Sequence, residues 1–172
     1  MPVRRKTLRR RRSSRRRNRQ HGGNQTRYMI QWYKSIPPEY LETINNSLTS
    51  EFVDVKEADL ATIHSCGVLV ELVSSNSREL AAYTIIDKSK GRCWYIKWLT
   101  TLPAHRGKGL AKGMLRVLKS QTVNCVTLHV APNSIASEIY AETGFTKTGK
   151  IRPMKDDLGQ DVHMEEMIMS KK

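Results

Sequence analysis

Three segments rich in β-branched and aromatic residues follow one another in the middle of the chain. They span residues 67–73, 80–86 and 93–101. The stretches between them, 74–77 and 87–91, are made of the Ser, Asn, Asp, Lys and Gly that favour tight turns. Strands joined by such short connections pair antiparallel with their neighbours. The sequence therefore predicts a meander of three strands at the centre of the fold.

Further elements are expected on both sides of the meander. The segment 28–33 is either a first strand or a lead-in segment. Pro37-Pro38-Glu39 opens a helix, because a proline in the first turn lacks only an N–H that would be unpaired anyway. A second short helix is expected over 57–63. After the meander, the pattern predicts a helix over 107–120, a strand over 123–130, a helix from about 133 to 144, and strands over 145–150 and 161–169.

The N-terminal segment has a different composition from the rest of the chain. Residues 1–20 contain eleven Lys or Arg and no acid. The whole chain carries 30 basic and 16 acidic residues, so the remainder is nearly balanced. A segment with so few apolar residues and so much like charge cannot form a core. We therefore expect a disordered tail over 1–25 and one folded domain over 26–172.

The tail indicates a polyanionic partner. The cations of residues 4–19 would release counterions from a polyphosphate, which gives salt-sensitive and sequence-independent binding. Nucleic-acid binding and a nuclear import signal are the two readings that this composition favours, whereas a mitochondrial transit peptide would need more apolar residues. No apolar stretch reaches the ~20 residues of a membrane helix. We expect an intracellular protein, in the nucleus or in a nucleoprotein particle such as a virion or ribosome, without membrane association.

The three cysteines are widely spaced and contain no CxxC pair. They are Cys66, Cys93 and Cys125. Such spacing is typical of neither a zinc site nor a disulfide framework. We therefore expect three reduced, buried thiols and no metal.

A glycine-spaced loop lies between the third strand of the meander and the following helix. Its sequence is Arg106-Gly107-Lys108-Gly109-Leu110-Ala111. The first turn of a helix has unpaired N–H groups that stabilise an anion, and glycine lets the backbone approach a ligand closely. A phosphate site and a tight turn that simply feeds a helix both fit this loop. Its spacing matches neither a P-loop nor a dinucleotide-binding fingerprint.

A second motif begins about 25 residues further on. After Leu128-His129-Val130, the chain reads Asn133-Ser-Ile-Ala136, then Tyr140 and Gly144-Phe145. Gly144 is placed to cap the C-terminus of this helix. Taken alone, the segment indicates a strand–helix–strand passage with one packed aromatic residue.

Together and in this order, the two motifs resemble the GNAT superfamily of N-acyltransferases. The first fits the family's Q/R-x-x-G-x-G/A signature, with Ala111 as the final small residue, and the second fits N-x-x-A-x-x-x-Y-x-x-x-G-F. The resemblance covers about residues 60–170 and leaves out the tail. It implies an α+β GNAT fold, in which about four helices flank a mixed, mostly antiparallel sheet of six to seven strands.

The resemblance also implies that acetyl-CoA lies between two splayed central strands. Its pyrophosphate would rest on backbone N–H groups of the loop, and its pantetheine arm would pair with strand backbone. By similarity, the cofactor-binding residues are Leu99, Thr101, Arg106, Gly107, Lys108, Gly109, Leu110, Ala111 and Asn133. The resemblance also implies that Lys108 or Lys112 would meet the terminal phosphate of the cofactor, and a solvated basic helix face is the competing interpretation of these two lysines.

The reaction implied is direct attack of a neutral amine on the thioester in a ternary complex. Tyr140 matches the family's tyrosine that protonates the leaving thiolate, although a packed aromatic residue would also fit there. The meander's third strand contains Lys97 and no acid, which argues against a histone-acetylating site. His129 is the leading general base, because imidazole titrates near neutral pH. Glu71, Glu142 or a chain of water molecules are alternatives.

Two classes of function therefore remain open from sequence. One is an acetyl-CoA-dependent N-acetyltransferase that acts on a primary amine and is tethered to nucleic acid by its tail. The other is a catalytically retired GNAT-fold component of a nucleoprotein assembly. The intact loop, Asn133 and Tyr140 favour the enzyme, because a retired site has no use for them.

Overall fold

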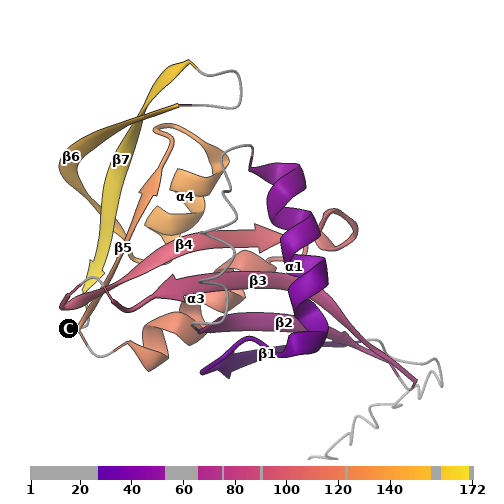
Figure 1. The fold of residues 1–172 in the computed structure, drawn as a ribbon. Coiled ribbons are helices and arrows are strands. Elements are labelled where there is room, and N and C mark those ends of the chain that lie inside the picture. Colours follow the sequence, from indigo (N-terminus) through magenta and orange to yellow (C-terminus); the bar gives the residue numbers. More distant parts are fainter. Residues whose placement is uncertain are drawn as a thin grey trace, which may run out of the picture.

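One seven-stranded sheet organises the chain. The structure is a computed structural model that describes residues 27–52, 66–74, 76–89, 91–122, 124–155 and 160–170. The sheet order is β1-β2-β3-β4-β5-β7-β6 (Figure 1). The strands are β1 (Arg27–Tyr33), β2 (Gly67–Val73), β3 (Arg78–Asp87), β4 (Cys93–Thr101), β5 (Cys125–Val130), β6 (Thr146–Lys155) and β7 (Asp161–Ser170). All neighbours pair antiparallel except β4 and β5, which are parallel. The predicted mixed, mostly antiparallel sheet is confirmed.

Helices flank the sheet, as predicted. The described part of the chain contains three α-helices and one 3-10 helix. They are α1 (Pro38–Glu51), η2 (Pro103–His105), α3 (Leu110–Gln121) and α4 (Ile135–Glu142). The basic segment 1–25 and the short helix expected over 57–63 lie outside the described residues.

The meander is confirmed, and β1 extends it by one strand. The segment left open between strand and lead-in is a full strand that pairs with β2 along its length. At the start of β2, Gly67 lies so close to β3 that a Cβ there would come within 2.0 Å of the carbonyl oxygen of Thr84. Only glycine fits at this point without moving β2 away from β3.

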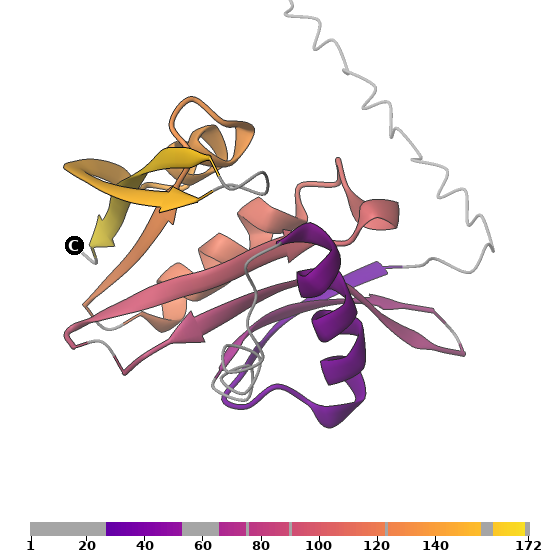
Figure 2. The same cartoon turned by 45° about the horizontal axis from the view of Figure 1, so that its top comes forward.

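Helices cover the two faces of this four-stranded part (Figure 2). On one face, α1 packs Ile44 and Leu48 against β2 and β3. On the other face, α3 packs Met114 and Leu118 against the same strands and β5. All four of these side chains are fully buried. The rigid centre that results fixes β4, the strand that borders the site.

The helix α3 begins three residues later than predicted. The sequence suggested a start at Gly107, whereas the first helical residue is Leu110. Gly107 and Gly109 have φ values of 75° and 72°, in the left-handed region that a right-handed helix cannot include. The loop therefore stays irregular up to the first turn of α3.

The strands β4 and β5 form a fork. Their parallel pairing covers only three residue pairs, from Cys93 with Cys125 to Tyr95 with Thr127. Beyond Tyr95, β4 pairs only with β3, so its other edge faces the gap. The fork divides the sheet into two arms. One arm is the four-stranded part from β1 to β4, and the other is β5, β7 and β6.

The expectation of three reduced thiols was wrong. Cys93 and Cys125 form a disulfide, with their Cα atoms 4.7 Å apart, at the closed end of the fork. Only Cys66 is a free, buried thiol, as predicted. No local pattern indicated this pair, because 32 residues separate two cysteines that the sheet places side by side.

No helix in the described ranges combines the length and the apolar character that a membrane span requires. Within the same ranges, no group of three or more His, Cys, Asp or Glu could hold a metal ion.

Candidate active site

A cavity of about 790 Å³ lies at the open end of the fork. It is bounded by the end of β4, the glycine-spaced loop, the start of α3 and one side of α4. Its lining is Glu51, Leu99, Thr100, Thr101, the run 106–112, Ile135, Ala136, Glu138, Ile139 and Glu142. The fold thus brings eight of the nine predicted cofactor-binding residues to one cavity.

The glycine-spaced loop presents bare backbone to this cavity. A Cβ at Gly107 or Gly109 would have no atom within 4 Å. No side chain caps the start of α3, although Gly113 N–H donates to the carbonyl of Gly109. The N–H groups of Leu110 to Lys112 therefore carry the partial positive charge of the helix start. This arrangement fits a phosphate group.

Arg106 ties the loop to its surroundings. Its Nε donates to the carbonyl of Thr101 at 3.0 Å, and its guanidinium pairs with Glu51 at 2.6 Å. The loop is thus anchored both to the end of β4 and to the C-terminal end of α1. Arg106 also lines the cavity, where its charge is paired with Glu51.

Lys108 and Lys112 both have side-chain partners, which neither sequence interpretation expected. Lys108 Nζ donates to the hydroxyl of Tyr28 at 2.8 Å, and that hydroxyl lies 3.0 Å from His105 Nδ1. Lys112 pairs with Glu142 of α4. The second contact connects the two helices that border the cavity.

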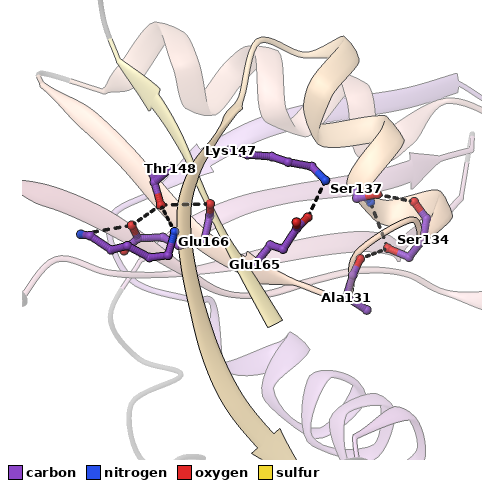
Figure 3. Close-up of polar contacts among 8 residues, drawn as sticks. Ala131, Ser134, Ser137, Lys147, Thr148, Glu165 and Glu166 are labelled. Carbon is purple, nitrogen blue, oxygen red and sulfur yellow. Dashed lines mark hydrogen bonds and ion pairs between the residues drawn. The ribbon is translucent and has the colours of Figure 1, made fainter. Parts of the chain in front are cut away.

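Asn133 lies apart from the other predicted cofactor residues. It lines a separate hollow of about 440 Å³ on the far side of α4, together with Lys147. There, Lys147 pairs with Glu165 at 2.7 Å, and Ser134 caps α4 by accepting from Ser137 N–H at 3.2 Å (Figure 3). Asn133 has a φ of 56°, so the turn before α4 is left-handed there.

Tyr140 is a buried residue of α4 that does not line the cavity. Its ring packs edge-on against Phe145 at 5.4 Å, and its exposed fraction is 8%. Burial raises the pKa of the Tyr140 hydroxyl to about 12, and the nearby Tyr95 contributes in the same direction. The hydroxyl therefore keeps its proton at neutral pH, and it is a weaker acid than an exposed tyrosine.

His129 meets a residue that sequence reasoning missed. Its Nδ1 lies 3.1 Å from the hydroxyl of Tyr95, so the contact bridges the two arms of the fork. Burial is the main cause that raises the pKa of Tyr95. An acid on β4 was the expected sign of a base there, and Tyr95 is not an acid. The signal that could have found it is a tyrosine on β4, the strand that runs parallel to the strand carrying His129.

The two alternative bases have other partners. Glu71 is 1% exposed, accepts from the hydroxyl of Tyr33 at 2.5 Å, and lies 3.4 Å from Arg78. It takes part in polar contacts among β1, β2 and β3 and does not line the cavity. Glu142 lines the cavity but pairs with Lys112. His129 differs from both alternatives in that its contact, with Tyr95, joins the two strands of the fork directly.

A family comparison identifies the class of protein. The sequence model described as "Acetyltransferase (GNAT) family" matches residues 27–145. The chain belongs to the GNAT acetyltransferase family, whose co-substrate is acetyl-CoA. None of the curated proteins compared with it matches significantly.

Solved structures share the fold at low sequence identity. NAA60 of Arabidopsis thaliana, in complex with a bisubstrate analogue, is 18% identical, with a TM-score of 0.65 over 84% of this chain and 100% of that one. The spermidine N-acetyltransferase of Vibrio cholerae, in complex with CoA and spermine, is 19% identical, with a TM-score of 0.65 over 82% and 95%. The ribosomal-protein-S18-alanine N-acetyltransferase of Escherichia coli is 16% identical, with a TM-score of 0.64 over 83% and 94%.

Proposed function

We propose that the protein transfers an acetyl group from acetyl-CoA to a primary amine by direct attack in a ternary complex. The observation that carries this proposal is the cavity between the end of β4 and α4, which is lined by an uncapped helix start and two left-handed glycines. A retired scaffold would not need bare backbone facing an open cavity.

Binding would use the backbone of the glycine-spaced loop. The N–H groups of Leu110 to Lys112 would hold the pyrophosphate of acetyl-CoA, with Arg106 adding charge. The free edge of β4 at Leu99 and Thr101 offers backbone groups for the pantetheine arm. The bound co-substrate supplies the activated acetyl thioester. Asn133 could join this set only if the hollow behind α4 communicates with the cavity.

Proton transfer would use the two sides of the fork. His129 accepts the proton that the attacking amine loses, and the hydroxyl of Tyr95 orients its ring at Nδ1. Tyr140 holds its proton at neutral pH and would deliver it to the leaving thiolate. Its neighbour Ile139 on α4 lines the cavity, whereas Tyr140 itself does not.

The first experiment measures binding of acetyl-CoA to the full chain by calorimetry. Gly109→Glu places a carboxylate where the phosphate would bind and should abolish binding. Gly91→Glu is the matched control, because Gly91 is also left-handed and a Cβ there meets no atom within 4 Å, but it lies in the β3–β4 turn. Micromolar binding lost only in Gly109→Glu supports the proposal. If the folded wild type does not bind acetyl-CoA, the proposal fails, and the alternative is a structural component of a nucleoprotein assembly.

We also propose that residues 4–19 tether this enzyme to nucleic acid, in the nucleus or in a nucleoprotein particle. The support is the density of positive charge in this segment. For double-stranded DNA, the slope of log K against log salt should be about −0.9 for each phosphate neutralised. Replacing Arg9, Arg10, Arg11 and Arg12 by Gln should reduce that slope by up to about 4. An unchanged slope would contradict the tether.

A further inference from the structure

The disulfide occupies a special position in the fork that holds the reacting residues. Cys93 pairs with Cys125 in the first of the three residue pairs that join β4 to β5. Tyr95 is two residues beyond Cys93, and His129 is four residues beyond Cys125. Because side chains alternate along a strand, all four residues lie on one face of the sheet. The bridge and the Tyr95–His129 contact are thus stacked along the same fork.

Different contacts join the two arms of the fork on the two faces of the sheet. On the face that α3 covers, buried side chains of β5 belong to the same core cluster as those of α3, β2 and β3. After Tyr95 and Thr127, the strands β4 and β5 have no further ladder pairs between them. The ion pair of Lys112 with Glu142 also joins the arms, but both of these side chains are partly exposed, and such pairs contribute little to stability. The disulfide is the covalent constraint on the face that carries Tyr95 and His129.

We propose that the Cys93–Cys125 disulfide is a positioning device that holds Tyr95 against His129, so that acetyl transfer depends on the thiol–disulfide state of the protein. This inference rests on the proposed function. Cys93 and Cys125 act through Tyr95 and His129 and touch no substrate.

The chemistry of the switch is an ordinary thiol–disulfide exchange. Two molecules of a small thiol of the glutathione type supply two electrons. The Sγ–Sγ bond breaks, Cys93 and Cys125 each take up a proton and become thiols, and the two small thiols become one disulfide. Both bridged cysteines are partly exposed, so a small thiol can reach them, whereas Cys66 is buried and donates to the carbonyl of Ile86. Disulfides of proteins that work in reducing compartments are usually of this responsive kind.

Opening the bridge should affect catalysis more than binding. A displacement of reacting groups by about 1 Å can cost on the order of 100-fold in rate. The glycine-spaced loop is attached to the other end of β4 and is anchored by Arg106, so acetyl-CoA should still bind. We expect reduction to lower kcat on the order of 10- to 100-fold, with less than about threefold change in the Kd for acetyl-CoA.

The test starts with the redox state of the full chain. Thiol titration of denatured protein, purified without reductant, should find one free thiol, and three after dithiothreitol. Three thiols before reduction would overturn the proposal. The contact between the Tyr95 and His129 rings is then followed by nuclear Overhauser effects in both states. It should weaken on reduction, and this readout needs no amine substrate.

Two variants complete the test. The double variant Cys93→Ser with Cys125→Ser should resemble the reduced protein and should not respond to dithiothreitol. Cys66→Ser is the control, because it keeps the bridge and should respond like the wild type. Rates are compared per folded molecule, measured by circular dichroism. An unchanged ring contact and kcat after reduction would refute the positioning role. If the protein binds no acetyl-CoA but loses the ring contact on reduction, only the proposed function is refuted.

Discussion

Replacement of Tyr140 by Phe tests the proton donor and its burial together. The ring would keep its edge-on packing against Phe145, because only the hydroxyl is removed. If Tyr140 protonates the leaving thiolate, kcat should fall on the order of 10²- to 10⁴-fold. The Kd for acetyl-CoA should stay within about threefold, since Tyr140 does not line the cavity.

The same substitution has a stability signature that depends on pH. Tyr140 has a pKa of about 12 in the folded protein, against a model-peptide value of about 10. A raised pKa contributes stability that is fully present below pH 10 and is lost as the pH rises through 12. By linkage, the wild type should lose about 2 kcal/mol from Tyr140 alone between pH 8 and pH 11.5.

Urea unfolding at these two pH values measures this contribution. Other buried tyrosines also titrate, but they are present in both proteins and cancel in the difference. Tyr140→Phe should therefore lose about 2 kcal/mol less than the wild type on going to pH 11.5. Equal losses of unfolding free energy in the wild type and the variant would show that the Tyr140 hydroxyl is not buried as the structure indicates. An unchanged kcat with the expected pH effect would leave Tyr140 as a packing residue only.

Three further predictions follow from single side chains. Gly67→Ala should destabilise the domain by about 1–3 kcal/mol, because β2 must move away from Thr84, and urea unfolding would show no loss if the strands are loosely paired there. Leu118→Ala, at a fully buried site, should cost about 2–5 kcal/mol in the same assay, and a loss below 1 kcal/mol would contradict its place in the core. His129→Gln should lower kcat on the order of 100-fold or more near neutral pH with little change in acetyl-CoA affinity, and an unchanged pH–rate profile would transfer the base role to water.

Much of the fold could be predicted because its signals are local. The meander follows from β-branched segments and turn residues, and α1 follows from the prolines that open it. The glycine-spaced loop was also local, since its residues are contiguous. The start of α3 was misplaced by three residues, because a sequence pattern does not reveal that Gly107 and Gly109 adopt left-handed φ angles.

The sequence alone determined the family, the order of the strands along the chain, and the contiguous loop that faces the cavity. Only the tertiary structure decided which distant residues meet. It paired Cys93 with Cys125, joined Tyr95 to His129 across the fork, and placed Asn133 behind α4. The reason is that strand neighbours in a sheet are set by the packing of all elements at once. Residues 32 or 34 positions apart carry no local signal that they will lie side by side.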